Sequence, residues 1–137
     1  MDAKIVGDVQ LRTKLCTTAS ATVIEAGDLV AMNSGLIIKA TATSAAVGYA
    51  PKGCADGETQ VEVSVGNDFL LKMDAEEDFE VAQKGVAYDI DVDGATGKQT
   101  LNQSGTTYEV LRVDISENAG TVDSKEDVLV RIEEPIF

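Results

Sequence analysis

Alternation of apolar and polar residues with a period of two dominates this sequence and favours β-structure over helix. Between residues 59 and 65, three valines alternate with polar residues, which is the pattern of a strand with one buried face. Residues 127–133 repeat this pattern, and residues 108–113 are rich in β-formers with weaker alternation. We predict further strands at residues 28–32, 35–40, 45–50, 68–72, 86–91 and 98–101.

Turn-forming clusters separate these segments at short intervals. Examples are Asn33-Ser34-Gly35, Pro51-Lys52-Gly53 and Asp93-Gly94. Many short strands with frequent turns are typical of a β-sandwich or a small barrel, and 137 residues fit a single domain. No long helical period is present, although residues 73–79 and residues 124–127 could each form one helical turn, the second after a capping serine.

The first twenty residues differ from the rest of the chain. Residues 9–15 alternate, and the residues after them are small and polar. Residues 1–20 carry three basic and two acidic side chains, whereas residues 21–137 carry eight basic and 22 acidic ones. We therefore predict a flexible N-terminal arm at residues 1–20 followed by a single β domain at residues 21–137. The alternative is that this segment is simply the first strand of the sheet.

Composition argues against several classes of function. A net charge of −13 repels nucleic-acid phosphates and anionic lipids, so neither nucleic acid nor membrane is expected as a partner. The chain contains no histidine and no C-x-x-C pair, which argues against a zinc site and removes the commonest general base. No apolar run reaches the roughly 18 residues of a membrane helix, and no secretory signal is recognisable at residues 1–8. We expect neither an enzyme nor a bound cofactor.

Cys16 and Cys54 are the only cysteines. Two free thiols in a reducing cytoplasm is the interpretation we favour, because a disulfide between them would need an oxidising compartment that no other feature of the sequence indicates.

Two short motifs suggest binding chemistry. Asp89-Ile90-Asp91-Val92-Asp93-Gly94 matches the opening of an EF-hand loop, but the twelfth position is Thr100 where a bidentate glutamate is required. We interpret it as the acidic end of a β-hairpin and leave weak calcium binding by Asp89–Asp93 open. Leu71-Lys72-Met73 partly matches the biotin-acceptor motif, and a core strand ending in a surface lysine is the simpler explanation.

Residues 74–80 contain five acidic side chains. Paired carboxyl groups can perform general acid–base work when one of them is desolvated and its pKa is raised. A solvated loop is the interpretation that we favour for such a run.

Several short phrases occur in an order that is familiar from one family. They are I-E-A-G-D-L-V at residues 24–30, A-A-V-G-Y-A at 45–50, G-E-T-Q-V-E-V at 57–63, F-L-L-K at 69–72, G-V-A-Y-D at 85–89 and V-L-V-R-I at 128–132. This pattern resembles the capsid decoration (cement) proteins of tailed bacteriophages, the lambda-like head decoration group and its relatives. The resemblance covers residues 22–133. Residues 1–20 have no counterpart in it, and residues 76–80 are more acidic than the pattern.

The resemblance implies a β-tulip or sandwich-like domain that assembles as a homotrimer. Such a protein is made in the host cytoplasm and binds the outer capsid surface of the virion, where it bridges neighbouring major capsid protein subunits of an expanded head. An N-terminal arm often orders on binding. From the alternation and charge contrast of residues 1–20, we predict Val9, Leu11, Arg12 and Leu15 as capsid-facing residues.

Three alternatives remain at this stage. The first is another phage virion β-module, such as a tail-tube or fibre component, which would share the composition. The second is a biotin- or lipoyl-type carrier domain centred on Lys72. The third is an extracellular adhesion module that depends on calcium.

Overall fold

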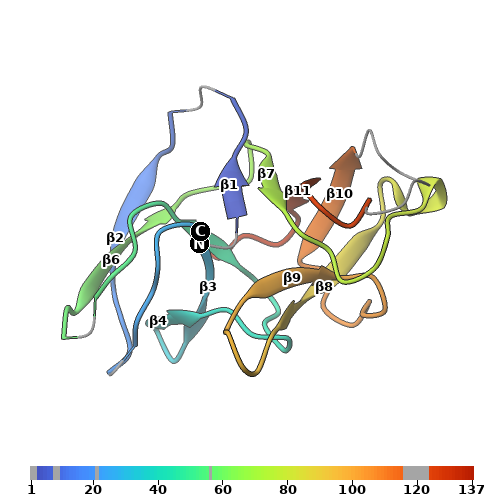
Figure 1. Ribbon diagram of the computed structural model, residues 1–137. Coiled ribbons are helices and arrows are strands. Elements are labelled where there is room, and N and C mark those ends of the chain that lie inside the picture. The colour runs from blue at the N-terminus through green and yellow to red at the C-terminus, as the bar shows by residue number, and fades with distance from the viewer. Residues whose placement is uncertain (1–2, 8–9, 21, 56, 116–123) are drawn as a thin grey trace.

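The structure, a computed structural model, describes residues 3–7, 10–20, 22–55, 57–115 and 124–137, and these form an almost entirely β chain (Figure 1). The strands are β1 (Ala3–Ile5), β2 (Thr13–Thr17), β3 (Asp28–Asn33), β4 (Leu36–Lys39), β5 (Gly48–Ala50), β6 (Gln60–Ser64), β7 (Leu71–Met73), β8 (Ala87–Val92), β9 (Gln99–Asn102), β10 (Leu111–Ile115) and β11 (Val128–Ile132). The helical element of this part of the chain is the short 3-10 helix η1 (Val81–Gln83). No helix in the described ranges is long and apolar enough to cross a membrane.

The strands form three sheets whose neighbouring strands are antiparallel. The largest has six strands in the order β1-β7-β11-β10-β8-β9, the second pairs β2 with β6, and the third has the order β4-β3-β5. The sheets stay open rather than closing into a barrel, as in a small all-β sandwich. The predicted all-β class is confirmed, and within it the open sandwich describes this chain better than a barrel.

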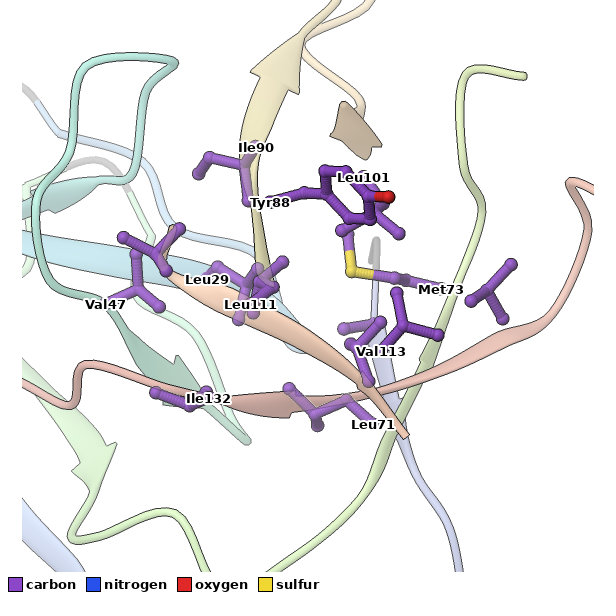
Figure 2. Close-up of a cluster of buried hydrophobic side chains, with 14 of the residues drawn as sticks. Leu29, Val47, Leu71, Met73, Tyr88, Ile90, Leu101, Leu111, Val113 and Ile132 are labelled. Carbon is purple, nitrogen blue, oxygen red and sulfur yellow. The ribbon is translucent and has the colours of Figure 1, made fainter. Parts of the chain in front are cut away.

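The larger hydrophobic core lies against the six-stranded sheet (Figure 2). Alternate residues of β10 and β11 turn toward this core, as the period-two pattern requires. Leu111, Val113, Val130 and Ile132 are all completely buried there. Figure 2 shows these strands meeting Leu29 and Val47 from the other part of the chain, so the larger core joins the six-stranded sheet to the three-stranded one.

A smaller core lies between the two-stranded and three-stranded sheets. Its buried members are Ile24, Val30, Ile37, Ala50, Cys54, Val61 and Val63. Strand β3 separates the two cores, because Leu29 and Ala31 belong to the larger one while Val30 belongs to the smaller one. Burial on both faces explains why residues 29–31 of β3 are continuously apolar.

A buried glutamine connects the six-stranded sheet to β3. The side chain of Gln99 on β9 is fully buried and accepts a hydrogen bond of 2.9 Å from the Leu29 N–H. Its amide nitrogen donates to the carbonyls of Leu29 at 2.7 Å and Ala40 at 3.1 Å. Gln99 therefore satisfies main-chain groups of β3 as a neighbouring strand would.

Each predicted strand overlaps an observed strand, with shifts at the ends, but both predicted helical turns are wrong. Met73 ends β7, and Ala75 forms a β-bridge with Leu101. At residues 124–127, Asp127 has a φ of 56°, which a right-handed helix excludes. The Ser124 hydroxyl accepts a hydrogen bond from the Phe79 N–H at 2.7 Å, so it does not cap a helix.

The described part of residues 1–20 is paired with the rest of the domain. Strand β1 pairs with β7 and β2 pairs with β6. Ala3 in β1 is only 1% exposed. These pairings fit the alternative in which the segment supplies a first strand, and the division of the chain at residue 20 stays a prediction.

Candidate functional site

The four residues predicted to face a capsid have different environments. Val9 lies outside the described residues. Leu11 is half-buried and packs against the larger core, so it anchors the chain before β2. Arg12 is exposed, and the side chain of Leu15 is 59% exposed. The side chains of Arg12 and Leu15 are therefore accessible to a binding partner, whereas the side chain of Leu11 is already packed inside the domain.

Strand β2 presents one face to the smaller core and the other to solvent. The Lys14 ammonium lies 4.7 Å from the centre of the Phe137 ring, and Cys16 packs against the smaller core. Thr13, Leu15 and Thr17 alternate with these residues and are exposed. The outer face of β2 is therefore uncharged, with an exposed leucine at its centre.

Charge is unevenly distributed between the first five strands and the remainder. Residues 1–51, blue to teal in Figure 1, hold four acidic and four basic side chains, whereas residues 52–137 hold 20 acidic and seven basic ones. A groove of about 440 Å³ beside the β3–β4 hairpin is lined by uncharged residues, all from the first part except Ile136. Met32, Ile38 and Thr41 are among them. Met32 and Leu36 on this hairpin are 42% and 38% exposed. The chain therefore combines a neutral first segment, which includes this hairpin, with a strongly acidic remainder.

An open acidic cleft of about 400 Å³ lies on the other part of the chain, lined by Glu76, Asp91, Asp93, Lys98 and Thr100. A hydrogen bond with Asp91, partial burial and the negative charges of Asp91 and Glu77 raise the pKa of Glu76 to about 7. The Lys98 ammonium is occupied by Asp74, at 2.6 Å. Glu76 therefore favours its protonated form up to near neutral pH.

The run of acidic residues from 74 to 80 is only partly the solvated loop that we favoured. Glu76, Glu77, Asp78 and Glu80 are exposed, but Phe79 between them is completely buried. The sequence pattern did not predict the pairing of Glu76 with Asp91, because this pairing depends on the loop lying along the edge of β9. Two hydrogen bonds hold the loop there, from the Leu101 N–H to the Asp74 carbonyl at 2.9 Å and from the Glu76 N–H to the Leu101 carbonyl at 3.0 Å.

The three aspartates of the EF-hand-like motif serve three separate purposes. Asp89 is buried and accepts hydrogen bonds from three successive main-chain N–H groups, those of Thr107, Tyr108 and Glu109, at 3.2, 2.7 and 2.7 Å. Asp93 accepts from the N–H groups of the following turn. The predicted hairpin is confirmed by the pairing of β8 with β9. Among the described residues, no group of three or more Cys, Asp or Glu side chains could hold a metal ion.

Lys72 lies within β7, and it pairs with Lys4 of β1 on one side and Leu129 of β11 on the other. A carrier lysine needs to protrude from a hairpin tip so that an enzyme can reach it. This placement gives the carrier hypothesis no support.

Both cysteine thiols are free in the structure. Burial raises the pKa of the Cys16 thiol, with a smaller opposing effect of Lys14. Cys54 is buried, and its thiol lies 3.5 Å from the Ala55 carbonyl and 3.6 Å from the Glu58 carbonyl. Both side chains belong to the packing of the smaller core.

Comparison with known protein families, with curated proteins and with solved structures finds no match for this chain.

Proposed function

We propose that this chain is a structural virion protein that binds the outer surface of an expanded phage capsid. In this role it bridges neighbouring major capsid protein subunits, as a homotrimer, and stabilises the shell. The observation that carries the proposal is the division of charge, with a neutral part at residues 1–51 and an excess of 13 acidic side chains in residues 52–137. The order of short phrases shared with phage decoration proteins supports the same function.

The neutral part has the composition that a protein-binding surface requires. Charged side chains are depleted at the centres of protein interfaces, because each buried charge must be desolvated and paired. The groove beside the β3–β4 hairpin has no charged residue in its lining, and Met32 and Leu36 expose apolar surface next to it. Contact through this region would bury apolar area without burying a carboxylate.

The acidic part suits the surface that stays in water. A high density of like charge keeps copies of a protein from associating in an uncontrolled way. On a shell, many copies lie close together, and the acidic parts would then face solvent. Because each copy that bridges two subunits makes its second contact at high effective concentration, individually weak contacts stabilise the shell collectively.

The test is co-sedimentation of the purified protein with expanded and unexpanded phage-type capsids, together with its solution mass. Saturable binding of a trimer to expanded shells alone is the expected result. A protein that binds neither shell would contradict the proposal, and a ring-shaped hexamer would point to a tail-tube component instead.

Two matched variants test which part of the surface makes the contact. Leu36 in the neutral part is 38% exposed and Val86 near β8 is 36% exposed, so a glutamate at either position is accommodated in the free protein. Leu36→Glu should weaken shell binding about tenfold or more, because it places an unpaired charge in the contact. Val86→Glu should leave binding unchanged. Equal effects of the two changes would show that the neutral part is not the contact surface.

A further inference from the structure

We infer that the free edge of β2, from Thr13 to Leu15, is a strand-addition site that takes an extended segment of a partner polypeptide. The inference deepens the proposed function, because the partner there would be a capsid subunit. Its basis is the direction of the main-chain groups of β2, the state of the other sheet edges and the side chains around Leu15.

Hydrogen bonds at the two ends of the β2–β6 pair show which way the main chain of β2 points. The Val65 N–H donates to the Arg12 carbonyl at 2.7 Å, and the Thr18 N–H donates to the Thr59 carbonyl at 2.9 Å. The register between these bonds is unbroken. Because bonded residues alternate along an antiparallel pair, Lys14 and Cys16 face β6. The N–H and C=O groups of Thr13 and Leu15 therefore point to the opposite edge.

Three other sheet edges in the described parts of the chain have a β-bridge on or beside them, at β9, β5 and β4. The loop at Ala75 bridges Leu101 on β9, and the C-terminal segment at Pro135 bridges Val47 beside β5. On β4, Ile37 forms a bridge with Thr18, and its carbonyl accepts a hydrogen bond from Ala19. Along β2 from Thr13 to Leu15, no described residue pairs with the edge opposite β6.

The side chains at this edge do not protect it. Natural edge strands are commonly guarded by outward lysines, prolines or bulges that prevent another strand from pairing. Lys14 would be such a guard, but it lies over the Phe137 ring. The outward side chains are Thr13 and Thr17, with Leu15 between them at 59% exposure. A strand edge without such protective residues, and with an exposed leucine beside it, is suited to pairing with a strand of another polypeptide.

The occupant that fits is an extended segment of another protein. Only an extended main chain offers N–H and C=O groups that alternate at the spacing of Thr13 and Leu15. The bridge between Thr18 and Ile37 closes the edge just beyond β2, so the added strand is short. An apolar residue of the partner strand would pack across from Leu15, in the way that cross-strand neighbours do.

Proline at position 15 is the sharpest test. The Leu15 N–H points away from β6, so Leu15→Pro removes a donor that the fold does not use, while blocking an added strand. Leu15→Val is the matched control, because it keeps both the N–H and an apolar side chain. Circular dichroism and thermal unfolding should show both variants folded. Leu15→Pro should lower the affinity for expanded shells at least about tenfold, and Leu15→Val should not.

Amide hydrogen exchange on the unaltered protein provides a second measurement that does not depend on the proline variant. In the free protein the Thr13 and Leu15 amides should exchange fast and the Lys14 and Cys16 amides slowly, and shell binding should slow the first two. Shell binding that leaves the Leu15 amide fast and tolerates Leu15→Pro would overturn the inference while leaving the proposed function intact.

Two other outcomes are decisive. If the protein binds no shell, the proposed function fails, and selection from a displayed library of short random peptides tests the edge alone. Peptides that bind the unaltered protein but not Leu15→Pro would support the inference, and recovery of none would overturn it.

If Leu15→Pro abolishes self-association instead, the edge joins copies of this chain, and a heterologous partner is excluded.

Discussion

The two hydrophobic cores differ in size and in what surrounds them. Among the described residues, the larger contains 20 buried residues and the smaller contains seven. The larger lies against the six-stranded sheet, and many of the acidic side chains stand in the segments that connect the strands of this sheet. The smaller core is bounded by β2, which carries the exposed Leu15 and the uncovered edge. The comparison suggests that the larger core supplies most of the stability, while the strands around the smaller core supply the surface for a partner.

The largest expected effect comes from truncating the same residue type in each core. Ile132 in the larger core and Ile37 in the smaller core are both completely buried. Ile132→Ala should lower the free energy of unfolding by about 4 kcal/mol, and Ile37→Ala by about 2.5 kcal/mol. The second cost is smaller because residues around a cavity in the smaller core can move in to fill more of it. Urea unfolding of both variants measures the difference. Equal costs would show that the smaller core is packed as rigidly as the larger one.

The next effect concerns the connection between the six-stranded sheet and β3. Gln99→Leu keeps the volume of the side chain but leaves the Leu29 N–H and the carbonyls of Leu29 and Ala40 without the bonds that Gln99 provides. The expected cost is about 3 kcal/mol of unfolding free energy, measured by denaturant titration. Gln60→Leu, at an exposed position on β6, is the control and should change stability by less than about 0.5 kcal/mol. A neutral Gln99→Leu would show that solvent or repacking replaces those bonds.

Much of the sheet structure could be predicted from the sequence, because the alternation of apolar and polar residues depends only on neighbours in the chain. The alternation in β6 and β11 predicted which residues are buried, and Val61, Val128 and Ile132 are buried accordingly. The helical turn predicted at residues 124–127 failed for a non-local reason. Ser124 has a capping side chain, but it bonds to Phe79, which is 45 positions away in the sequence.

The candidate site was only partly predictable for the same reason. The alternation and charge contrast of residues 1–20 led us to predict Leu15 as a capsid-facing residue, and its 59% exposure leaves it available to a partner. The same alternation could not distinguish a capsid contact from an internal anchor at Leu11, because that depends on which core lies beneath it. The neutral character of residues 1–51 is visible in the sequence, but its gathering beside a groove requires the pairing of β3 with β4 and β5.

The smallest expected effect is a pH dependence in the acidic part. The pKa of Glu76 is raised from 4.5 to about 7, so the folded state favours its protonated form. The resulting stabilisation is fully present below pH 4.5 and is lost as the pH rises through 7. Glu76→Gln should therefore be more stable than the unaltered protein above pH 7, and this advantage should shrink toward pH 4.5.

Because Glu76 is exposed, solvent screening limits this advantage to less than about 1 kcal/mol, and added salt should reduce it further. Thermal unfolding at a series of pH values measures it. Glu134→Gln, an exposed position that is not part of the cleft lining, removes the same charge and separates the local effect from that of net charge. An advantage of the same size and pH dependence in both variants would mean that general repulsion among the acidic residues, rather than the pair formed by Glu76 and Asp91, distinguishes this part of the molecule from the neutral one.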